Sequence, residues 1–260
     1  MPCPEGGSTE PLLTNIPVLD WSRVHVYTPA GIHVPSTRSD LVAIVRKVEK
    51  SGSKAKAVGS VYSLSNAPDS DDFVIDTKRL NCHLSQPFPP PPTPLADTRW
   101  LAAEGWTERM DTFRSKDHNN AWLADFAGDD LPRDGRHLVH VEAGIRIRQL
   151  LADLDSADLA VPTMGAAGGQ TLAGALSTST HGADLDLGTL GDYVRAVHLV
   201  AVDGQEWWIE RNGGAGRFVE YSAWPGWCAD MRIVRDSDFL ETMLAQQDNI
   251  ICCQMAAFAQ

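Results

Sequence analysis

The sequence predicts an α+β fold in two parts, and three segments carry the prediction. A strand, helix, strand order is expected over residues 25–81, and a second strand and helix over residues 137–162. A hairpin is expected over residues 193–211, and no internal repeat is found. At 260 residues the chain can form one large domain or two small ones without a disulfide or a metal.

The composition is that of an ordinary soluble globular protein, with 43% hydrophobic and 22% charged residues. A net charge of -12 argues against a nucleic-acid partner, because phosphate backbones are held by clustered Lys and Arg. Five cysteines without metal-ligand or redox spacing favour a reduced, intracellular protein. Neither a signal peptide nor an apolar run that could span a bilayer is found, so we expect a cytoplasmic protein.

The first part should contain one amphipathic helix between short strands. Thr37 or Ser39 can cap the helix, and Gly52 follows its end. The apolar positions of its buried face are Leu41, Ile44, Val45 and Val48. The segment "KAKAVGSVYSLSNAP" then predicts a strand that enters a small-residue loop, and "FVIDTKRLN" predicts a second buried strand.

Residues 83–135 have a different character. The run "QPFPPPPTPLADTRW" cannot join a helix or a central strand, and "FAGDDLPRDGRH" is acidic and rich in turn formers. Aromatic residues between these runs indicate packing against another surface, so we expect an insertion with a partly ordered middle. These aromatic residues are Trp100, Trp106, Phe113, Trp122 and Phe126.

The second part should begin with a strand, a glycine turn at Gly144 and a helix. The apolar face of that helix is made of Ile147, Leu150, Leu151 and Leu154. The later hairpin should turn at Asp203 and Gly204. Its first strand should alternate, with Val194, Val197, Leu199 and Ala201 as the apolar positions.

The segment "GQTLAGALSTSTHGAD" offers many hydrogen-bond donors and little charge. Backbone amides exposed by Gly and Ala, together with neighbouring hydroxyls, suit a pyrophosphate or a polar heterocycle. A tightly packed Gly/Ala turn with a short helix explains the same composition equally well. The segment alone does not decide between these two interpretations.

His181 does not by itself indicate catalysis. A serine hydrolase would pair it with Ser177 or Ser179, but the G-x-S-x-G motif is absent. A metal site built from His181, Asp184 and Asp186 lacks a second histidine at a coordinating spacing. The sequence therefore assigns no catalytic residue and no metal ligand.

A second loop, "AVGSVYSLSN", has the same chemistry as the first. Gly59 permits a tight turn, and the serines offer hydroxyls beside free amides. Neither G-x-x-x-x-G-K-[ST] nor G-x-G-x-x-G is present, which argues against a nucleoside-triphosphate loop and a Rossmann fingerprint. An ordinary serine-rich turn remains the alternative.

Four segments in order resemble the FAD-binding domain, of PCMH type, of the vanillyl-alcohol oxidase superfamily. They are "HVPSTRSDLVAIVRKVEKSGSKAKAVGSVYSLSNAP", "FVIDTKRLN", "VHVEAGIRIRQLLADL" and "GQTLAGALSTSTHGADLDLGTLGDYVRAVHLVAVDG". The sugar-lactone and alditol oxidase branch is the most similar. The resemblance implies two α+β subdomains with FAD extended between them, and oxidation of a CH-OH group of a sugar, alditol or aldonolactone by hydride transfer to flavin N5. It implies a small-molecule substrate.

The resemblance also implies the residues that contact FAD. From the pyrophosphate loop they are Lys56, Gly59, Ser60, Val61, Tyr62, Ser63 and Ser65. From the second segment they are Gly165, Thr171, Leu172, Ala173, Gly174, Thr178, Ser179, Thr180 and His181. Many relatives carry a histidine covalently bonded to the flavin where this chain has Tyr62, so non-covalent FAD is expected.

The domain boundaries follow from this comparison. We expect an N-terminal lead (1–30), a first FAD-binding subdomain (31–82), the insertion (83–135), a second FAD-binding subdomain (136–235) and a divergent or truncated tail (236–260). Relatives continue past the stretch like "MRIVRDSDFLETML" into a Gly-rich strand and a substrate-binding domain. The sequence therefore predicts a flavin half without its substrate half.

Two alternative functions stay open at this stage. One is a non-catalytic or remnant FAD-binding domain that needs a partner chain or a lost C-terminal domain to cover the flavin. The other is an NAD(P)H-dependent reductase on the same FAD fold.

Overall fold

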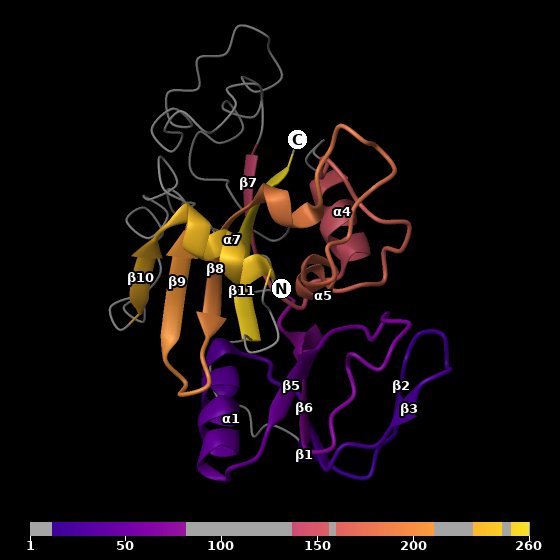
Figure 1. Cartoon of the computed structure of the whole chain (residues 1–260), viewed down its shortest axis with the longest axis vertical. Coiled ribbons are helices and arrows are strands. Elements are labelled where there is room, and N and C mark those ends of the chain that lie inside the picture. Colours follow the sequence, from indigo (N-terminus) through magenta and orange to yellow (C-terminus); the bar gives the residue numbers. More distant parts are fainter. Residues whose placement is uncertain (1–11, 82–136, 156–159, 211–230, 246–250, 260) are drawn as a thin grey trace, which may run out of the picture.

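The computed structural model describes residues 12–81, 137–155, 160–210, 231–245 and 251–259. These residues form two parts, each a sheet with its own helices, stacked along the long axis of the molecule (Figure 1). The predicted α+β fold in two parts is confirmed. The predicted insertion at 83–135 lies outside the described residues.

The first part is built on a four-stranded sheet. Its strands, in spatial order, are β1 (Leu12–Leu13), β4 (Gly31–His33), β6 (Phe73–Asp76) and β5 (Ala55–Val58). The last three are parallel, and β1 pairs antiparallel with β4 at the edge. A separate hairpin consists of β2 (Val18–Leu19) and β3 (Val26–Tyr27), and the 3-10 helix η1 (Thr77–Arg79) follows β6.

Helix α1 (Arg38–Lys50) begins at Thr37 and covers one face of this sheet. The Thr37 hydroxyl accepts a hydrogen bond from Asp40 N (3.1 Å), and the Asp40 carboxylate accepts one from Thr37 N (3.0 Å). This reciprocal capping box shows that Thr37, and not Ser39, caps the helix. The predicted apolar face is buried against the sheet, and the hairpin packs on the opposite face through Val18 and Tyr27.

The second part is a five-stranded sheet with three helices on one face. Its strands, in spatial order, are β10 (Arg232–Arg235), β9 (Glu206–Glu210), β8 (Val194–Val200), β11 (Ile251–Ala259) and β7 (His137–Glu142). Its helices are α4 (Ile147–Asp155), α5 (Leu172–Ser177) and α7 (Ser237–Ala245), and the 3-10 helix η2 (Leu190–Tyr193) precedes β8. Apolar side chains from α4, α5 and α7 share one core with β7, β8 and β9.

One detail of the β8–β9 hairpin differs from the sequence prediction. Strand β8 does not alternate, because Ala196, Val197, His198, Leu199 and Val200 are all buried. The cause is its central position: β9 and β11 flank it, and Val200 packs against the core of α1. The predicted hairpin of β8 and β9 is confirmed.

Within the region 236–260, expected as a divergent tail, the structure describes α7 and β11, and β11 is a strand of the second sheet. Strand β11 lies between β7 and β8 and is antiparallel to both. The sequence "ICCQMAAFA" explains this position, because a nearly continuous apolar run without Gly or Pro suits a strand inside a sheet. The lead expected at 1–30 likewise supplies β1 and the β2–β3 hairpin to the first part.

Polar contacts join the two parts at several points. Gly144 N donates to Leu80 O (2.7 Å), and Arg46 donates to Gly204 O (3.4 Å). Arg38, at the start of α1, pairs with Glu206 on β9 at 3.2 Å. No helix among the described residues is long and apolar enough to cross a membrane.

Replacement of Thr37 by Ala should lower the free energy of unfolding by about 1 kcal/mol, because one half of the capping box is lost. Urea denaturation measures the difference. Ser39→Ala is the matched control, since Ser39 is exposed and does not cap the helix; its effect should stay within about 0.5 kcal/mol. Equal losses in both variants would contradict the assignment of Thr37 as the cap.

Candidate cofactor site

The first predicted cofactor loop begins where β5 ends, at Gly59. Among the described residues, the backbone N–H groups of residues 60–63 find no hydrogen-bond acceptor. The Ser60 hydroxyl oxygen is buried and has no partner there either. Unpaired donors and a buried orphan hydroxyl are costly unless a ligand satisfies them, so this loop fits an anionic group such as a pyrophosphate.

Val61 gives this loop an unusual backbone. Its φ is 53°, in the left-handed region, which a β-branched residue rarely adopts. Such a conformation costs on the order of 1–3 kcal/mol and is typical of ligand-binding loops. The surrounding contacts must therefore hold Val61 in place, and its side chain packs beside the core of Ile32, Val58 and Val74.

The backbone amides at the two ends of the second predicted loop differ in their hydrogen bonding. Leu172 N donates to Ile145 O (2.8 Å) and Ala173 N to Ala143 O (3.1 Å), so these amides are used inside the fold. By contrast, the N–H groups of residues 165–170 donate to no group within the described chain. The free donors of this loop are therefore those of residues 165–170.

The two loops lie against each other. A Cβ atom on Gly59 would overlap the Thr171 side chain, and one on Gly169 would overlap the Tyr62 hydroxyl. Thr171 is 1% exposed, and its hydroxyl accepts a hydrogen bond from Gly174 N (3.3 Å) to cap α5. Two segments more than a hundred positions apart thus bring their unpaired amides to one boundary between the two parts.

The other predicted contact residues have structural partners of their own. Lys56 lies within β5, and its ammonium group donates to Ala67 O (2.7 Å). The Ser63 and Ser65 hydroxyls are 3.0 Å apart. Thr178 donates to Gly174 O (3.1 Å), and the Thr180 methyl group packs against Gly165. The roles of these residues toward FAD stay predictions.

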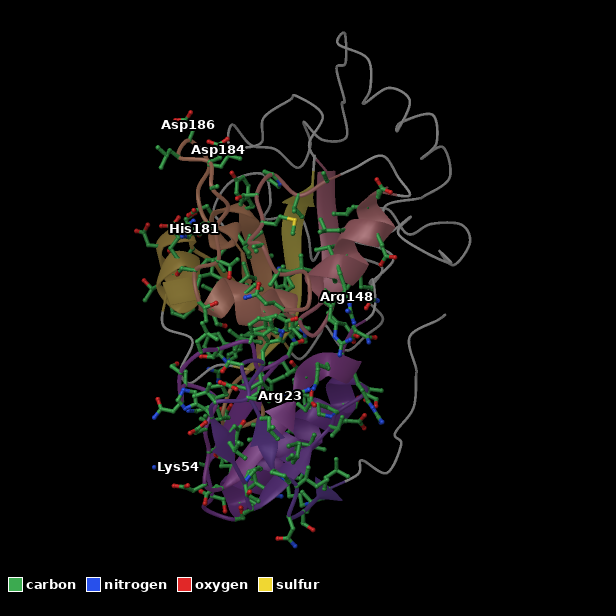
Figure 2. The ribbon with its side chains drawn as sticks, turned by 90° about the vertical axis from the view of Figure 1, so that its right-hand side faces the viewer. Arg23, Lys54, Arg148, His181, Asp184 and Asp186 are labelled. Atoms are coloured by element: carbon green, nitrogen blue, oxygen red, sulfur yellow. The ribbon has the colours of Figure 1, made fainter. Side chains whose placement is uncertain are left out.

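His181 lies in an exposed loop of the second part. Its Nδ1 is 2.7 Å from Gly182 O, and Gly182 N donates to Thr163 Oγ1 (2.9 Å). Figure 2 shows His181, Asp184 and Asp186 along this loop, with the two aspartates at its outer end. No group of three or more His, Cys, Asp or Glu side chains that could hold a metal occurs in the described ranges. His181 is thus tied to its own loop rather than poised beside another titratable group.

Two arginines adjoin the second loop through their backbones, and one of them, Arg146, forms an isolated β-bridge with Thr171. Arg148, in the first turn of α4, is exposed and donates its backbone N–H to Gly168 O (2.8 Å). Figure 2 places Arg148 near the boundary between the two parts. Unpaired backbone amides would supply hydrogen bonds to an anion bound there.

Tyr27 lies beneath the first loop, in the core that also contacts Val61. Its hydroxyl is buried and has no hydrogen-bond partner among the described residues. Burial, followed by the nearby charges of Asp69 and Asp76, raises the pKa of Tyr27 to about 12. The phenol is therefore held neutral in the folded chain.

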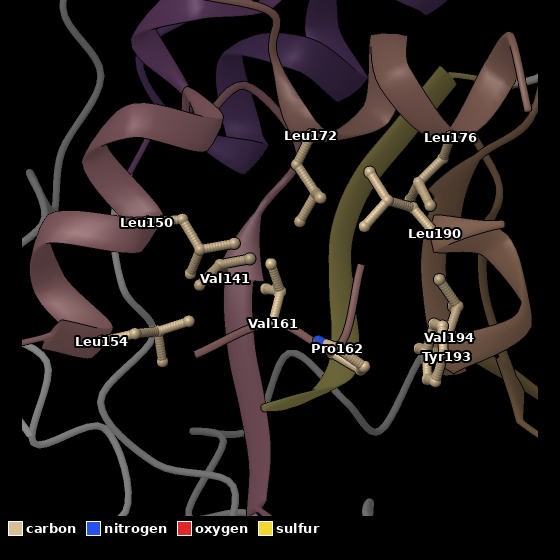
Figure 3. A pocket seen from close by; sticks show the side chains of 10 residues that line it. All are labelled: Val141, Leu150, Leu154, Val161, Pro162, Leu172, Leu176, Leu190, Tyr193 and Val194. Atoms are coloured by element: carbon tan, nitrogen blue, oxygen red, sulfur yellow. The ribbon is translucent and has the colours of Figure 1, made fainter. Parts of the chain in front are cut away.

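A small cavity lies elsewhere, inside the core of the second part (Figure 3). Its volume is about 20 Å3, which is room for one water molecule. The side chains that line it come from β7, α4, α5, η2, the start of β8 and residues 161–162, and they are apolar apart from Tyr193. It has neither the size nor the polar groups to orient a cofactor, so it is a packing defect of the core.

Comparison with known proteins shows what part of the chain is similar to. Residues 129–210 match a family model described as FAD binding domain. This part of the chain is similar to an FAD-binding domain. The match includes the second loop, α4, α5 and the β8–β9 hairpin, and it indicates FAD as the cofactor. The resemblance stated from the sequence is confirmed.

Relatives of the FAD-binding domain include two curated proteins. Over 68 residues, 26% of this chain and 12% of the relative, it is 40% identical to a Neurospora crassa protein named "Putative D-arabinono-1,4-lactone oxidase". Over 179 residues, 68% of this chain and 27% of the relative, it is 25% identical to a "Long-chain alcohol oxidase" of an uncultured marine euryarchaeote. The chain thus spans a small share of these relatives.

Solved structures support the fold. The cholesterol oxidase of Brevibacterium sterolicum, as its His121Ala mutant, superimposes with a TM-score of 0.60 at 15% identity. The alignment covers 99% of this chain and 39% of that chain. The two-part arrangement of this chain is therefore a known fold.

Sequence reasoning missed two features of the site. Residues 166–170 are not among the predicted contact residues, although the "GAAGGQ" run is a usable signal for their unpaired amides. Trp21 stacks on Tyr62, with ring centroids 5.5 Å apart, but no sequence signal links residues so far apart.

Gly59→Ala should weaken FAD binding about tenfold or more, because the new methyl group would push the first loop away from Thr171. Fluorescence titration with FAD measures the dissociation constant. Gly191→Ala is the matched control, since its Cβ would meet no atom closer than 3.4 Å. Unchanged FAD affinity in Gly59→Ala would contradict the close contact of the two loops.

Tyr27→Phe should make the fold less sensitive to alkaline pH. Because the pKa of Tyr27 is raised from 10.0 to about 12, its contribution to stability is present below pH 10 and is lost as pH rises toward 12. Thermal melts of both proteins between pH 9 and about pH 12 test this, with a smaller fall in Tm expected for Tyr27→Phe. Parallel curves for the two proteins would contradict it.

Proposed function

We propose that this chain is the FAD-binding part of an oxidoreductase that acts on a CH-OH group of a sugar, alditol or aldonolactone. The observation that supports it most is the pair of amide-rich loops that meet at Gly59 and Thr171, the second of which lies within residues 129–210, the part matched to an FAD binding domain. The relatives named as lactone, alcohol and cholesterol oxidases support the reaction class. The 40% identity with the lactone oxidase relative favours sugar-derived substrates.

The chain's own residues would hold FAD through backbone amides and small side chains. Residues 60–63 would donate to one side of the pyrophosphate and residues 165–170 to the other, with the Ser60 hydroxyl as a further donor. Bound FAD would supply the hydride acceptor, at flavin N5. Gly59 and Gly169 would let the two loops approach closely enough to share one ligand.

The proposal includes non-covalent attachment of FAD. Tyr62 stands where relatives with a covalent bond carry histidine, and a tyrosine cannot form the histidyl link. The position of Tyr62 supports this view, because its ring is enclosed between Trp21 and Gly169. The substrate-binding groups and the catalytic base would come from a further domain or a partner chain that covers the flavin.

The purified chain should bind FAD and release it intact on acid precipitation. Flavin absorbance should then appear in the supernatant, because no covalent bond retains it. Flavin that stays in the protein pellet would contradict non-covalent attachment, and no binding after reconstitution with FAD would contradict the cofactor itself.

Activity is tested with the same FAD-loaded protein. Hydrogen peroxide release over a panel of aldonolactones, alditols and long-chain alcohols should be highest for a sugar-derived donor. Bound FAD without oxidation of any donor, with either oxygen or an artificial acceptor, would reduce the function of this chain to FAD binding. Reduction of the flavin by NADPH alone would favour the reductase alternative.

A further inference from the structure

Trp21, in the loop between β2 and β3, contacts two consecutive residues of the first cofactor loop. Its backbone N–H donates to Val61 O at 2.8 Å. Its indole ring stacks on the ring of Tyr62, with centroids 5.5 Å apart and an interplanar angle of 18°. The N-terminal hairpin therefore holds the loop both by a hydrogen bond and by an aromatic contact.

The loop needs such a support because of Val61. With φ at 53°, Val61 adopts a conformation that a β-branched residue leaves unless its surroundings hold it. Residue 61 is also central to the run 60–63, whose N–H groups are unpaired among the described residues. A change in the backbone at Val61 would turn these donors away from a shared ligand.

The hairpin is rigid enough to act as the support. Asp20 is buried, and its carboxylate accepts hydrogen bonds from Ser22 Oγ (2.7 Å) and Val24 N (3.0 Å). Asp20 N donates to His25 O (3.1 Å), which closes the loop around Trp21. Beneath it, Val18 and Tyr27 anchor the two strands in the core of the first part.

The Trp21 side chain itself contributes little to that core. It is 63% exposed, whereas Val18 and Tyr27 pack against the sheet. Its stacking partner Tyr62 in turn reaches Gly169 of the second loop. Contacts between Trp21 and Tyr62, and between Tyr62 and Gly169, thus connect the hairpin with both cofactor loops.

We infer that Trp21 is a positioning residue, which holds the loop around Val61 in its FAD-binding conformation by stacking on Tyr62 and donating to the Val61 carbonyl. This inference rests on the proposed binding of FAD. It adds a function for the N-terminal hairpin, since a segment outside both cofactor loops would set the affinity for the cofactor.

The test is FAD affinity, measured by fluorescence titration on the full chain. Trp21→Ala should bind FAD about three- to tenfold more weakly, because the stack with Tyr62 is lost. Trp21→Phe keeps a stacking ring and should stay within about twofold of the wild type. Leu19→Ala is the matched control: Leu19 is an exposed apolar residue of the same hairpin, and its loss should leave affinity unchanged.

Repeating the Trp21→Ala substitution in a Val61→Gly variant shows whether Trp21 acts through Val61. Glycine adopts a left-handed backbone without strain, so in Val61→Gly the further change Trp21→Ala should weaken FAD binding less than it does in the wild type. An equal loss in both backgrounds, or equal affinities of Trp21→Ala and the wild type, would overturn the inference. If Trp21→Ala does not fold, Trp21→Leu replaces it, with the same expected loss.

The outcomes separate this inference from the proposed function. A wild-type chain that binds no FAD would contradict the proposed function. A wild-type chain that binds FAD as tightly as Trp21→Ala would contradict only the role of Trp21.

Discussion

The close approach of Gly59 to Thr171 is the constraint on which the site depends. Thr171 is buried, caps α5 through its hydroxyl and faces the backbone of the first loop, so no side chain fits between them. Gly144 has the same role nearby, because a Cβ there would overlap the carbonyl oxygen of Thr77. Backbone contacts at two glycines thus bring the two sheets together and place the unpaired amides of both loops at one boundary.

This arrangement explains how an acidic chain can bind an anionic cofactor. The net charge is -12, and Lys56, the cation nearest in sequence to the first loop, is bonded to Ala67 O. Unpaired backbone N–H groups supply directed partial positive charge that does not depend on the net charge of the protein. Their position is fixed by the fold, so a ligand meets donors that are already oriented.

The local features of the fold were predictable from the sequence. The periodicity of residues 41–48 gave the buried face of α1, and the turns at Gly144 and Gly204 came from local turn chemistry. Strands of two residues such as β1–β3 carry too little pattern to be recognised. The place of β11 between β7 and β8 is a long-range pairing, which no local pattern reports.

The contacts within the site likewise depend on long-range pairing that a local sequence pattern does not report. Both loops were recognised by their small and hydroxyl residues, but the use of each amide depends on distant partners. Leu172 and Ala173 are predicted to line the cofactor, and the structure shows that their amides bond to the carbonyls of Ile145 and Ala143. Trp21 was missed because its contact with Tyr62 exists only after the hairpin packs on the first sheet.

We propose that residues 60–63 and 165–170 donate hydrogen bonds from their backbone amides to one FAD molecule. Hydrogen–deuterium exchange of the full chain, with and without saturating FAD, measures this directly. Both segments should exchange more slowly when FAD is present, while the amides of Leu172 and Ala173, already bonded within the fold, should change little. Slower exchange in only one segment, or in neither although FAD is bound, would contradict the claim.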